Sequence, residues 1–142
     1  MTSFQANEFS TRLPEGLKDK TVNVFSLTDD GPSDLSVVVI RDRPLQGEAL
    51  AVYVERQLGV LQQRLPLFRI LHRGEAVLDG EPAVQLDYTW MSGPTAMFQR
   101  QVILYAPLSG GVLLVSATCK GRLEPAWEEM FGAFLADFRL NR

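Results

Sequence analysis

The sequence predicts an α+β fold in which an antiparallel sheet is backed by two helices, and residues 1–142 are expected to form one domain. Short segments rich in β-branched and aromatic residues alternate with turns that contain Gly and Pro, as is typical of strands. Two longer segments have apolar residues at helical spacing. The order of strands, helix, strands and helix, without a repeat or linker, favours a mainly antiparallel sheet.

The first strands are predicted on either side of a tight turn. Residues 21–27 and 35–42 are rich in β-branched and aromatic side chains, and the turn sequence Asp29-Asp30-Gly31-Pro32 separates them. Residues 4–9 are a weaker strand candidate ahead of them. The first helix is expected over residues 47–65 and ends before Pro66, which cannot continue it. Its apolar residues share one helical face: Leu50, Val54, Leu58, Leu61 and Leu65.

The second half of the chain is predicted to form a meander of strands followed by a helix. The strands are expected over residues 68–73, 75–78, 83–91, 96–106 and 111–119, with Gly or Pro in most of the breaks. The last helix is expected over residues 124–138, and Pro125 suits its first turn. Its apolar side carries Trp127, Met130, Phe131, Phe134 and Phe138.

Composition and charge disfavour several classes of protein. The net charge is −3 and the 14 basic residues are scattered, so no nucleic-acid partner is expected. The N-terminus has neither the basic region nor the apolar region of a signal peptide, and no apolar run approaches the ~18 residues of a membrane span. We therefore expect a cytoplasmic protein that does not itself insert into a membrane.

The chemistry-bearing residues do not combine into a recognisable active site. His72 is the only histidine and Cys119 the only cysteine, which is too few for a zinc site. His72 is expected to lie at a sheet surface. The acidic residues Asp29, Asp30, Asp34, Glu128 and Glu129 are expected to be solvated rather than to act as an acid/base pair. Gly110-Gly111 lacks the flanking residues of a phosphate loop. We expect neither an enzyme nor a bound cofactor or metal.

Several predicted strands are apolar on both sides. In residues 21–27, Val22 and Val24 point to one side of the strand and Phe25 and Leu27 point to the other. A sheet with one solvated face should instead alternate apolar and polar residues along each strand. If both helices cover one face, the other keeps exposed aliphatic residues, which mark a binding or oligomer surface. Alternatively, loops or closure of the sheet bury both faces. Periodicity does not decide between these arrangements.

Two glutamines occupy positions suited to contacting a ligand. Gln57 lies within or beside the apolar stripe of the first helix, and Gln101 precedes Val102 and Ile103 in a strand. An amide in an apolar groove can hydrogen-bond a ligand. The alternative is an amide at the edge of the stripe that reaches water.

The sequence resembles the DcrB-like family and, within it, the effector-associated (Eag) chaperones of bacterial type VI secretion. The resemblance spans roughly residues 20 to 135. The segments that carry it are Arg41-Asp42, Tyr53-Val54-Glu55-Arg56-Gln57-Leu58, Leu65-Pro66-Leu67-Phe68, Leu86-Asp87-Tyr88-Thr89-Trp90, Arg100-Gln101 and Glu124-Pro125-Ala126-Trp127.

The resemblance implies a fold of the Mog1/PsbP type, with a curved sheet, and a homodimer. It implies that concave apolar surfaces hold the N-terminal transmembrane helices of a toxic effector in the cytoplasm until the effector is loaded onto the secretion spike. The positions matching that family's groove are Val22, Val24, Val38, Gln57, Leu65 and Gln101.

Two departures accompany the resemblance. Unlike DcrB itself, the chain has no lipid-accepting cysteine near its N-terminus, and this difference favours the cytoplasmic chaperones. In addition, Leu67 stands where the resemblance leads us to expect Gly. The main alternative is a general protein-interaction module on a Mog1/PsbP-like scaffold. Such a module would bind a folded partner through loops, with charges such as Asp29 and Asp30, and would carry no transmembrane cargo.

Overall fold

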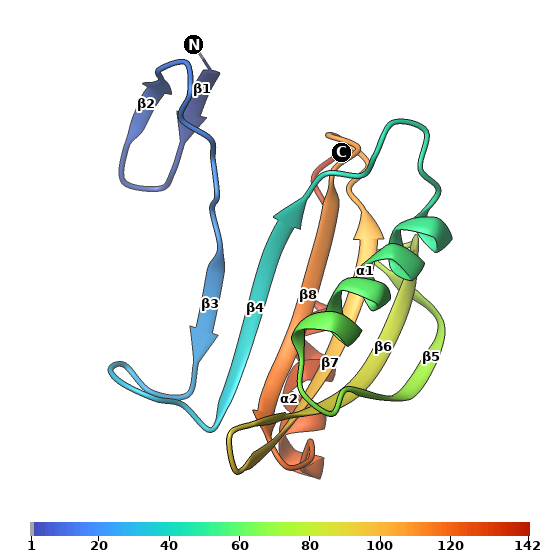
Figure 1. The fold of residues 1–142 in the computed structure, drawn as a ribbon. Helices are drawn as coiled ribbons and strands as arrows, with labels where there is room; N and C mark the ends of the chain where they lie inside the picture. The colour runs from blue at the N-terminus through green and yellow to red at the C-terminus, as the bar shows by residue number, and fades with distance from the viewer. Residues whose placement is uncertain (1) are drawn as a thin grey trace.

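A curved, six-stranded antiparallel sheet forms the body of the protein in a computed structural model that describes residues 2–142 (Figure 1). The strands lie side by side in the order β3, β4, β8, β7, β6, β5, and each neighbouring pair is antiparallel. Their bounds are β3 (Asn23–Ser26), β4 (Leu35–Asp42), β5 (Arg69–Leu78), β6 (Glu81–Ser92), β7 (Thr95–Tyr105) and β8 (Val112–Lys120). The predicted α+β class and the meander are confirmed.

Two expected strands form one. Residues 68–73 and 75–78 belong to the single strand β5, whose register shifts between Ile70 and His72. This bulge, together with Gly74 inside the strand, interrupts the pattern of side chains that a regular strand would show. The sequence pattern therefore suggested a break where the backbone continues.

The two helices, α1 (Leu50–Arg64) and α2 (Pro125–Ala136), lie on opposite faces of the sheet. Consecutive residues of β7 show this division, since Val102 belongs to the core cluster with Phe131 of α2, whereas Ile103 belongs to the cluster with Val54 of α1. Figure 1 places α1 in front of the sheet and α2 behind it. The arrangement with both helices on one face is wrong. The central strands are apolar on both sides because each side has its own helix.

Hydrogen bonds fix α1 on the sheet at its first turn. The hydroxyl of Tyr53 donates to the carboxylate of Asp42 at the end of β4 over 2.6 Å, and the hydroxyl of Tyr105 in β7 donates to the backbone oxygen of Glu48 over 2.6 Å. At the other end, Leu65 adopts an extended backbone before Pro66, whose carbonyl accepts the amide of Met91 in β6. The helix is thus held at both ends.

An ion-pair network joins α2 to the opposite face. Arg100 of β7 donates two hydrogen bonds to the carboxylate of Asp87 in β6, over 3.0 and 2.9 Å, and a third to Glu128 of α2 over 3.1 Å. The bond to Asp87 is the main reason that the pKa of Arg100 is raised. Phe131 is 1% exposed and anchors the helix in the core. Glu128 therefore takes part in the attachment of α2.

The N-terminus forms a hairpin that stands apart from the sheet (Figure 1). Its strands, β1 (Thr2–Gln5) and β2 (Ser10–Leu13), pair with each other in a separate two-stranded sheet. The single strand expected over residues 4–9 is wrong, because the chain reverses direction between Gln5 and Ser10. The amide of Ala6 donates to the carbonyl of Phe9, and the rings of Phe4 and Phe9 lie 5.7 Å apart across the turn.

Candidate functional site

α1 covers only part of its face of the sheet. For residues 2–142, the core cluster beneath this helix draws its strand residues from β6, β7 and β8 and includes none from β3 or β4. Figure 1 shows the same division, with α1 lying over β7 and β6 while β4 and β3 extend beyond it. The side chains of Val24, Val38 and Ile40 point to this face, and we call these three residues the open strip. Val24 is 61% exposed and Ile40 is 40% exposed.

The orientation of the open strip follows from strand alternation. Leu35, Val37 and Val39 are buried against the α2 side, so the intervening Val38 and Ile40 of β4 point to the α1 side. Val24 of β3 pairs with Val38 across the ladder and shares its face. The exposed aliphatic residues of β3 and β4 therefore lie at one edge of the α1 face.

Three of the six predicted site residues lie in one row across the sheet. The register places Val24 opposite Val38, Val38 opposite Ser116, and Ser116 opposite Gln101. The row therefore runs from the open strip toward the residues beneath α1. Val22 lies immediately before β3 and is 49% exposed.

The polar end of this row is a hydrogen-bonded cluster. The amide nitrogens of Gln101 and Gln99 both lie within hydrogen-bonding distance of the hydroxyl oxygen of Ser116, at 3.1 and 3.3 Å. Thr118 in turn donates to the side-chain oxygen of Gln99 over 3.0 Å. Gln101 is 4% exposed, and its Oε1 is buried without a hydrogen-bond partner. This carbonyl oxygen is therefore an acceptor that the hydrogen bonds of the described residues leave unsatisfied.

Gln57 and Leu65 both belong to the helical side of this surface. Gln57 is half-buried and lies one turn after Tyr53, whose hydroxyl reaches Asp42 at the end of β4, so both lie on the flank of α1 that faces β4. Leu65 directly follows α1, is half-buried and packs against the core cluster beneath the helix. A substitution at Leu65 therefore alters core packing as well as the surface.

Strand alternation in the sequence put Gln99 on the same side as Gln101, but it did not identify Ser116 and Thr118 as neighbours of Gln101. These residues recur at every second position of β7 and β8, which places them on one face. That spacing was visible in the sequence, but the pairing of β7 with β8 in this register was not. The predicted importance of Gln101 rested on its position in an apolar strand and on the resemblance, whereas its contacts with Ser116 follow from register.

Cys119 and His72 lie far apart in the sheet. Cys119 is in β8 and His72 is in β5, so β7 and β6 separate them. Cys119 is buried on the α2 side, its burial raises the pKa of its thiol, and its Sγ donates to the carbonyl of Arg122. His72 is exposed, as predicted for a residue at the sheet surface. Between residues 2 and 142, no group of three His, Cys, Asp or Glu side chains is placed to hold a metal ion.

A second apolar surface lies on the opposite side of the sheet. Phe25 of β3 and Met130 of α2 are each 50% exposed, and the ring of Phe25 lies 5.5 Å from that of Phe134. An open pocket of about 470 Å³ adjoins it, lined by Met130, Ala133, Phe134, Asp137 and Phe138. We call Phe25, Met130 and Phe134 the α2 patch.

Over the described residues, no helix is both long and apolar enough to cross a membrane.

Comparison with known proteins finds relatives along most of the chain. The family model DcrB matches residues 8–137. Effector EagT6 of Pseudomonas aeruginosa is 33% identical over 135 residues, which cover 91% of this chain and 92% of that protein. The crystal structure of PA94, a Pseudomonas aeruginosa protein of unknown function, superposes with a TM-score of 0.78 at 27% identity and covers 100% of this chain and 98% of that one.

A more distant structure shares the fold alone. LpqN, involved in cell envelope biogenesis of Mycobacterium tuberculosis, has a TM-score of 0.52 at 21% identity. The match covers 80% of this chain and 66% of the LpqN chain. At this identity the likeness says nothing about a shared ligand.

Proposed function

Because this chain belongs to the DcrB family and is related to effector EagT6, we propose that it is an effector-associated chaperone of type VI secretion. In this proposal it binds the N-terminal transmembrane helices of a secreted effector and shields them before the effector is loaded onto the secretion spike. The observation that carries the proposal is the relationship to EagT6 over 91% of the chain. We also propose that the scaffold is of the Mog1/PsbP type, as the resemblance implies.

The open strip gives such a cargo an apolar surface. A transmembrane helix in water exposes apolar area, and covering that area is worth roughly 25 cal/mol per Å². Val24, Val38 and Ile40 offer aliphatic side chains next to the flank of α1, and Val22 extends them. A helix laid on this surface would bury its apolar face, as in other cases where a helix binds a groove. The three residues of the strip are uncharged, so covering them desolvates no charged side chain of the strip itself.

Gln57 and Gln101 are proposed to contact polar groups of the cargo. Transmembrane helices often associate through small and hydroxyl-bearing residues, whose polar groups need partners away from water. The buried Oε1 of Gln101 is an acceptor without a partner in this chain. Gln57 lies on the α1 flank that faces β4. Leu65 is proposed to complete the apolar lining at the end of α1.

We further propose the cellular setting that the resemblance implies. The protein acts in the cytoplasm as a homodimer, contacts the spike protein only through its effector, and does not insert into a membrane itself. It needs no cofactor, because covering apolar surface requires no chemical step.

The test is co-expression with the N-terminal hydrophobic segment of a type VI effector encoded beside this gene, followed by affinity purification. We expect a soluble complex that Val24→Asp abolishes, because a charge would then face the apolar cargo. Val24 suits this test better than Leu65, since it is 61% exposed and the isolated variant should keep its thermal stability.

The matched control is the double variant Asp29→Asn, Asp30→Asn in the loop between β3 and β4. Both residues are exposed and lie outside the strands. A chaperone that uses the open strip should solubilise its cargo equally well with this variant. Loss of binding with the loop variant, and full binding with Val24→Asp, would instead favour the general interaction module.

A further inference from the structure

We propose that residues 2–22 form an arm that docks on the α2 patch of a second copy of this chain. The arm consists of the β1–β2 hairpin and the segment that leads to β3. The inference rests on the homodimer of the proposed function and adds the residues that hold the two copies together.

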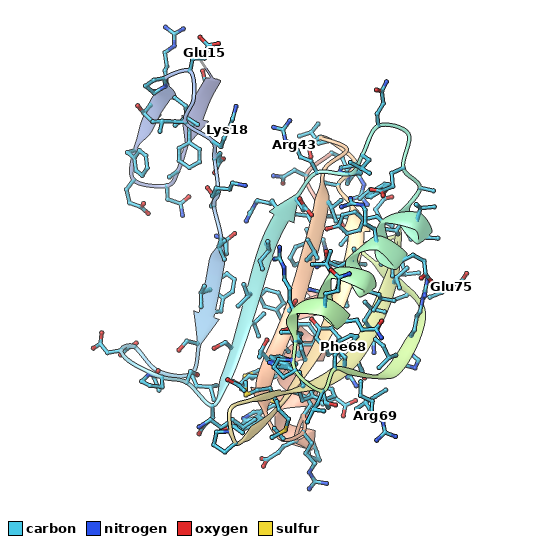
Figure 2. The ribbon with its side chains drawn as sticks, in the orientation of Figure 1. Glu15, Lys18, Arg43, Phe68, Arg69 and Glu75 are labelled. Carbon is cyan, nitrogen blue, oxygen red and sulfur yellow. The ribbon has the colours of Figure 1, made fainter. Side chains whose placement is uncertain are left out.

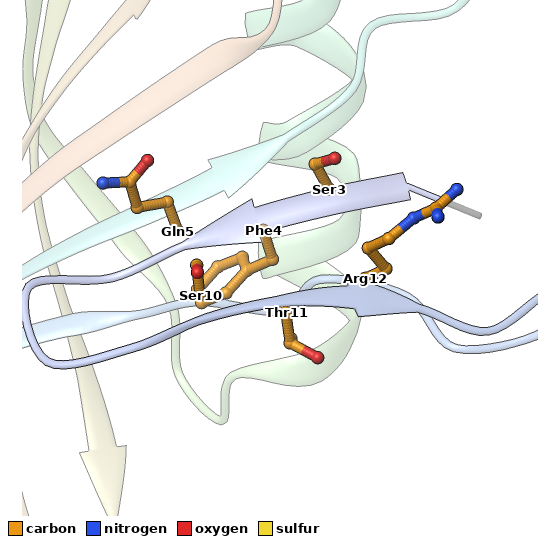
Figure 3. Close-up of a pocket in the computed structure, with 6 residues that line it drawn as sticks. All are labelled: Ser3, Phe4, Gln5, Ser10, Thr11 and Arg12. Atoms are coloured by element: carbon orange, nitrogen blue, oxygen red, sulfur yellow. The ribbon is translucent and has the colours of Figure 1, made fainter.

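The hairpin has one apolar face and one polar face. Phe4 lies opposite Thr11 in the ladder, and alternation along β2 puts Leu13 on the same side. The ring of Phe9 contacts that of Phe4, at 5.7 Å between centroids. The opposite side of the ladder carries Ser3, Gln5, Ser10 and Arg12. Both strands line a small pocket of about 330 Å³. Figure 3 shows Phe4 between the two strands. This division is typical of a hairpin that packs on an apolar surface.

The apolar face has no such surface within its own chain. For the described part of the chain, neither core cluster contains a residue of β1 or β2. Figure 1 shows the hairpin standing clear of the sheet and of α1, and Figure 2 shows the same for the hairpin side chains that it draws. Phe9 is 56% exposed, and Leu17 in the segment after the hairpin is 60% exposed. Because an isolated two-stranded hairpin is only marginally stable in water, the arm needs a partner to be well ordered.

The α2 patch is the complementary surface at the root of the arm. Phe25 follows the arm directly in sequence and contacts Phe134 of α2. The pocket beside them is lined largely by apolar side chains. The charges on residues 124–138 are all acidic, including Asp137 in that pocket, whereas the arm carries three basic and three acidic residues and has no net charge. The match between the arm and the patch is therefore apolar rather than electrostatic.

Geometry favours a second copy over folding back. The arm leaves β3 and runs beyond the end of the sheet, away from α2, which lies behind the sheet (Figure 1). β3 is an edge strand that pairs only with β4 in the sheet. Two copies related by a two-fold axis along this edge could exchange arms, so that each arm reaches the patch of the other and the assembly closes. The α2 patch and the open strip lie on opposite faces, so this exchange leaves the strip free for cargo.

The native mass of the protein without cargo, measured by light scattering, tests whether the arm holds two copies together. The full chain should elute as a dimer with twice the mass of a 15.9 kDa protomer. The double variant Phe4→Glu, Phe9→Glu should halve that mass. The control Gln5→Glu, Ser10→Glu places the same two charges on the polar face of the hairpin and should remain dimeric.

A second pair of variants tests the α2 patch, the surface on which the arm is proposed to dock. Met130→Glu should also give a monomer, because the charge enters the α2 patch. Gly132→Glu introduces the same charge on the other flank of α2, where an added side chain meets open space, and should leave the dimer intact. Thermal unfolding of each variant identifies any that fails to fold.

A photo-crosslinking residue at position 9 of the full chain gives a second measurement that does not depend on those variants. We expect it to label a second copy, at α2, both with and without the co-expressed effector segment. If the dimer survives substitution of Phe4 and Phe9, or if the crosslink forms to the effector instead of to α2, the proposal that the arm docks on a second copy is wrong, but the homodimer is not. A monomeric full chain would overturn the homodimer too, while the effect of Val24→Asp on cargo would still decide the chaperone proposal.

Discussion

Gln101 and Ser116 face each other across β7 and β8, and the amide of Gln101 donates to the hydroxyl oxygen of Ser116 over 3.1 Å. The other end of the same amide, Oε1, is buried without a partner. A buried polar atom without a hydrogen bond costs about 1–3 kcal/mol. We therefore expect this unpartnered oxygen to cost the free protein stability. Such a cost is expected where a residue is kept for binding rather than for folding.

The variant Gln101→Met should separate these two effects. Methionine has a similar length and no polar atom to satisfy, so we expect the free energy of unfolding to stay the same or to rise by up to about 1–2 kcal/mol. The same variant should bind the effector segment more weakly, because it removes the acceptor. Chemical denaturation and co-purification measure the two effects on the same preparation. If stability falls while cargo binding is unchanged, Gln101 has a structural role alone.

Glu48 should make the attachment of α1 sensitive to acid. Its carboxylate accepts hydrogen bonds from Arg56, over 2.9 and 2.8 Å, and from the amide of Leu45 over 3.0 Å. Arg56 is the main cause that lowers the pKa of Glu48 below its ordinary value of 4.5. Because the folded-state pKa is the lower one, this stabilisation is complete above 4.5 and is lost as the pH falls through the folded-state value.

The comparison with Glu48→Gln tests this effect. At neutral pH the variant should be less stable than the native chain, since a neutral amide replaces the charged acceptor of Arg56. The difference should shrink as the pH falls from 4.5 through the lower folded-state pKa of Glu48, where the native side chain becomes neutral too. Denaturation curves across this pH range measure it. A constant difference between the two proteins at every pH would contradict the assignment.

Phe131 should stabilise the fold mainly through its packing in the core. It is 1% exposed and lies in the cluster between α2 and the sheet. Phe131→Ala should lower the free energy of unfolding by about 3–5 kcal/mol, because it removes a buried ring and leaves a cavity. Leu108→Ala is the control, since Leu108 is 72% exposed and its truncation should change stability by less than about 0.5 kcal/mol. Equal losses would mean that α2 is not packed as described.

The sequence predicted the helices well because their signals are local. The stripe from Leu50 to Leu65 faces the core beneath α1, and Pro125 stands in the first turn of α2, as periodicity and helix-start chemistry indicated. The N-terminal hairpin was missed for the opposite reason. Its turn at residues 6–9 carries no Gly or Pro, so nothing local distinguished it from a strand.

The positions of the helices relative to the sheet could not be obtained from periodicity. Alternating apolar residues showed that both sides of the sheet need cover, but they do not say which helix supplies it. The same limit applies to the site. Val24, Val38 and Gln101 share a row only because β3 pairs with β4, β4 with β8 and β8 with β7. Ser116 became visible as part of that row only when this long-range register was known.

Leu67 should be a position where glycine improves stability. It directly follows Pro66 after α1, is 81% exposed, and has a φ of 53°, in the left-handed region that favours glycine. This conformation costs a residue with a Cβ roughly 1–2 kcal/mol, whereas glycine costs about 0.5–1 kcal/mol through its greater freedom in the unfolded chain. The balance favours Leu67→Gly by up to about 1 kcal/mol, and the resemblance led us to expect Gly at this position.

The comparison variant is Leu67→Ala, which removes the exposed side chain but keeps the Cβ. Relief of the backbone strain requires the glycine variant to be more stable than the alanine variant in thermal and chemical unfolding. If alanine matched or exceeded glycine, the left-handed conformation would carry no cost here. If Leu67→Gly also leaves cargo binding unchanged, the exposed leucine is not part of the binding surface, and the proposed site stays on the sheet and the flank of α1.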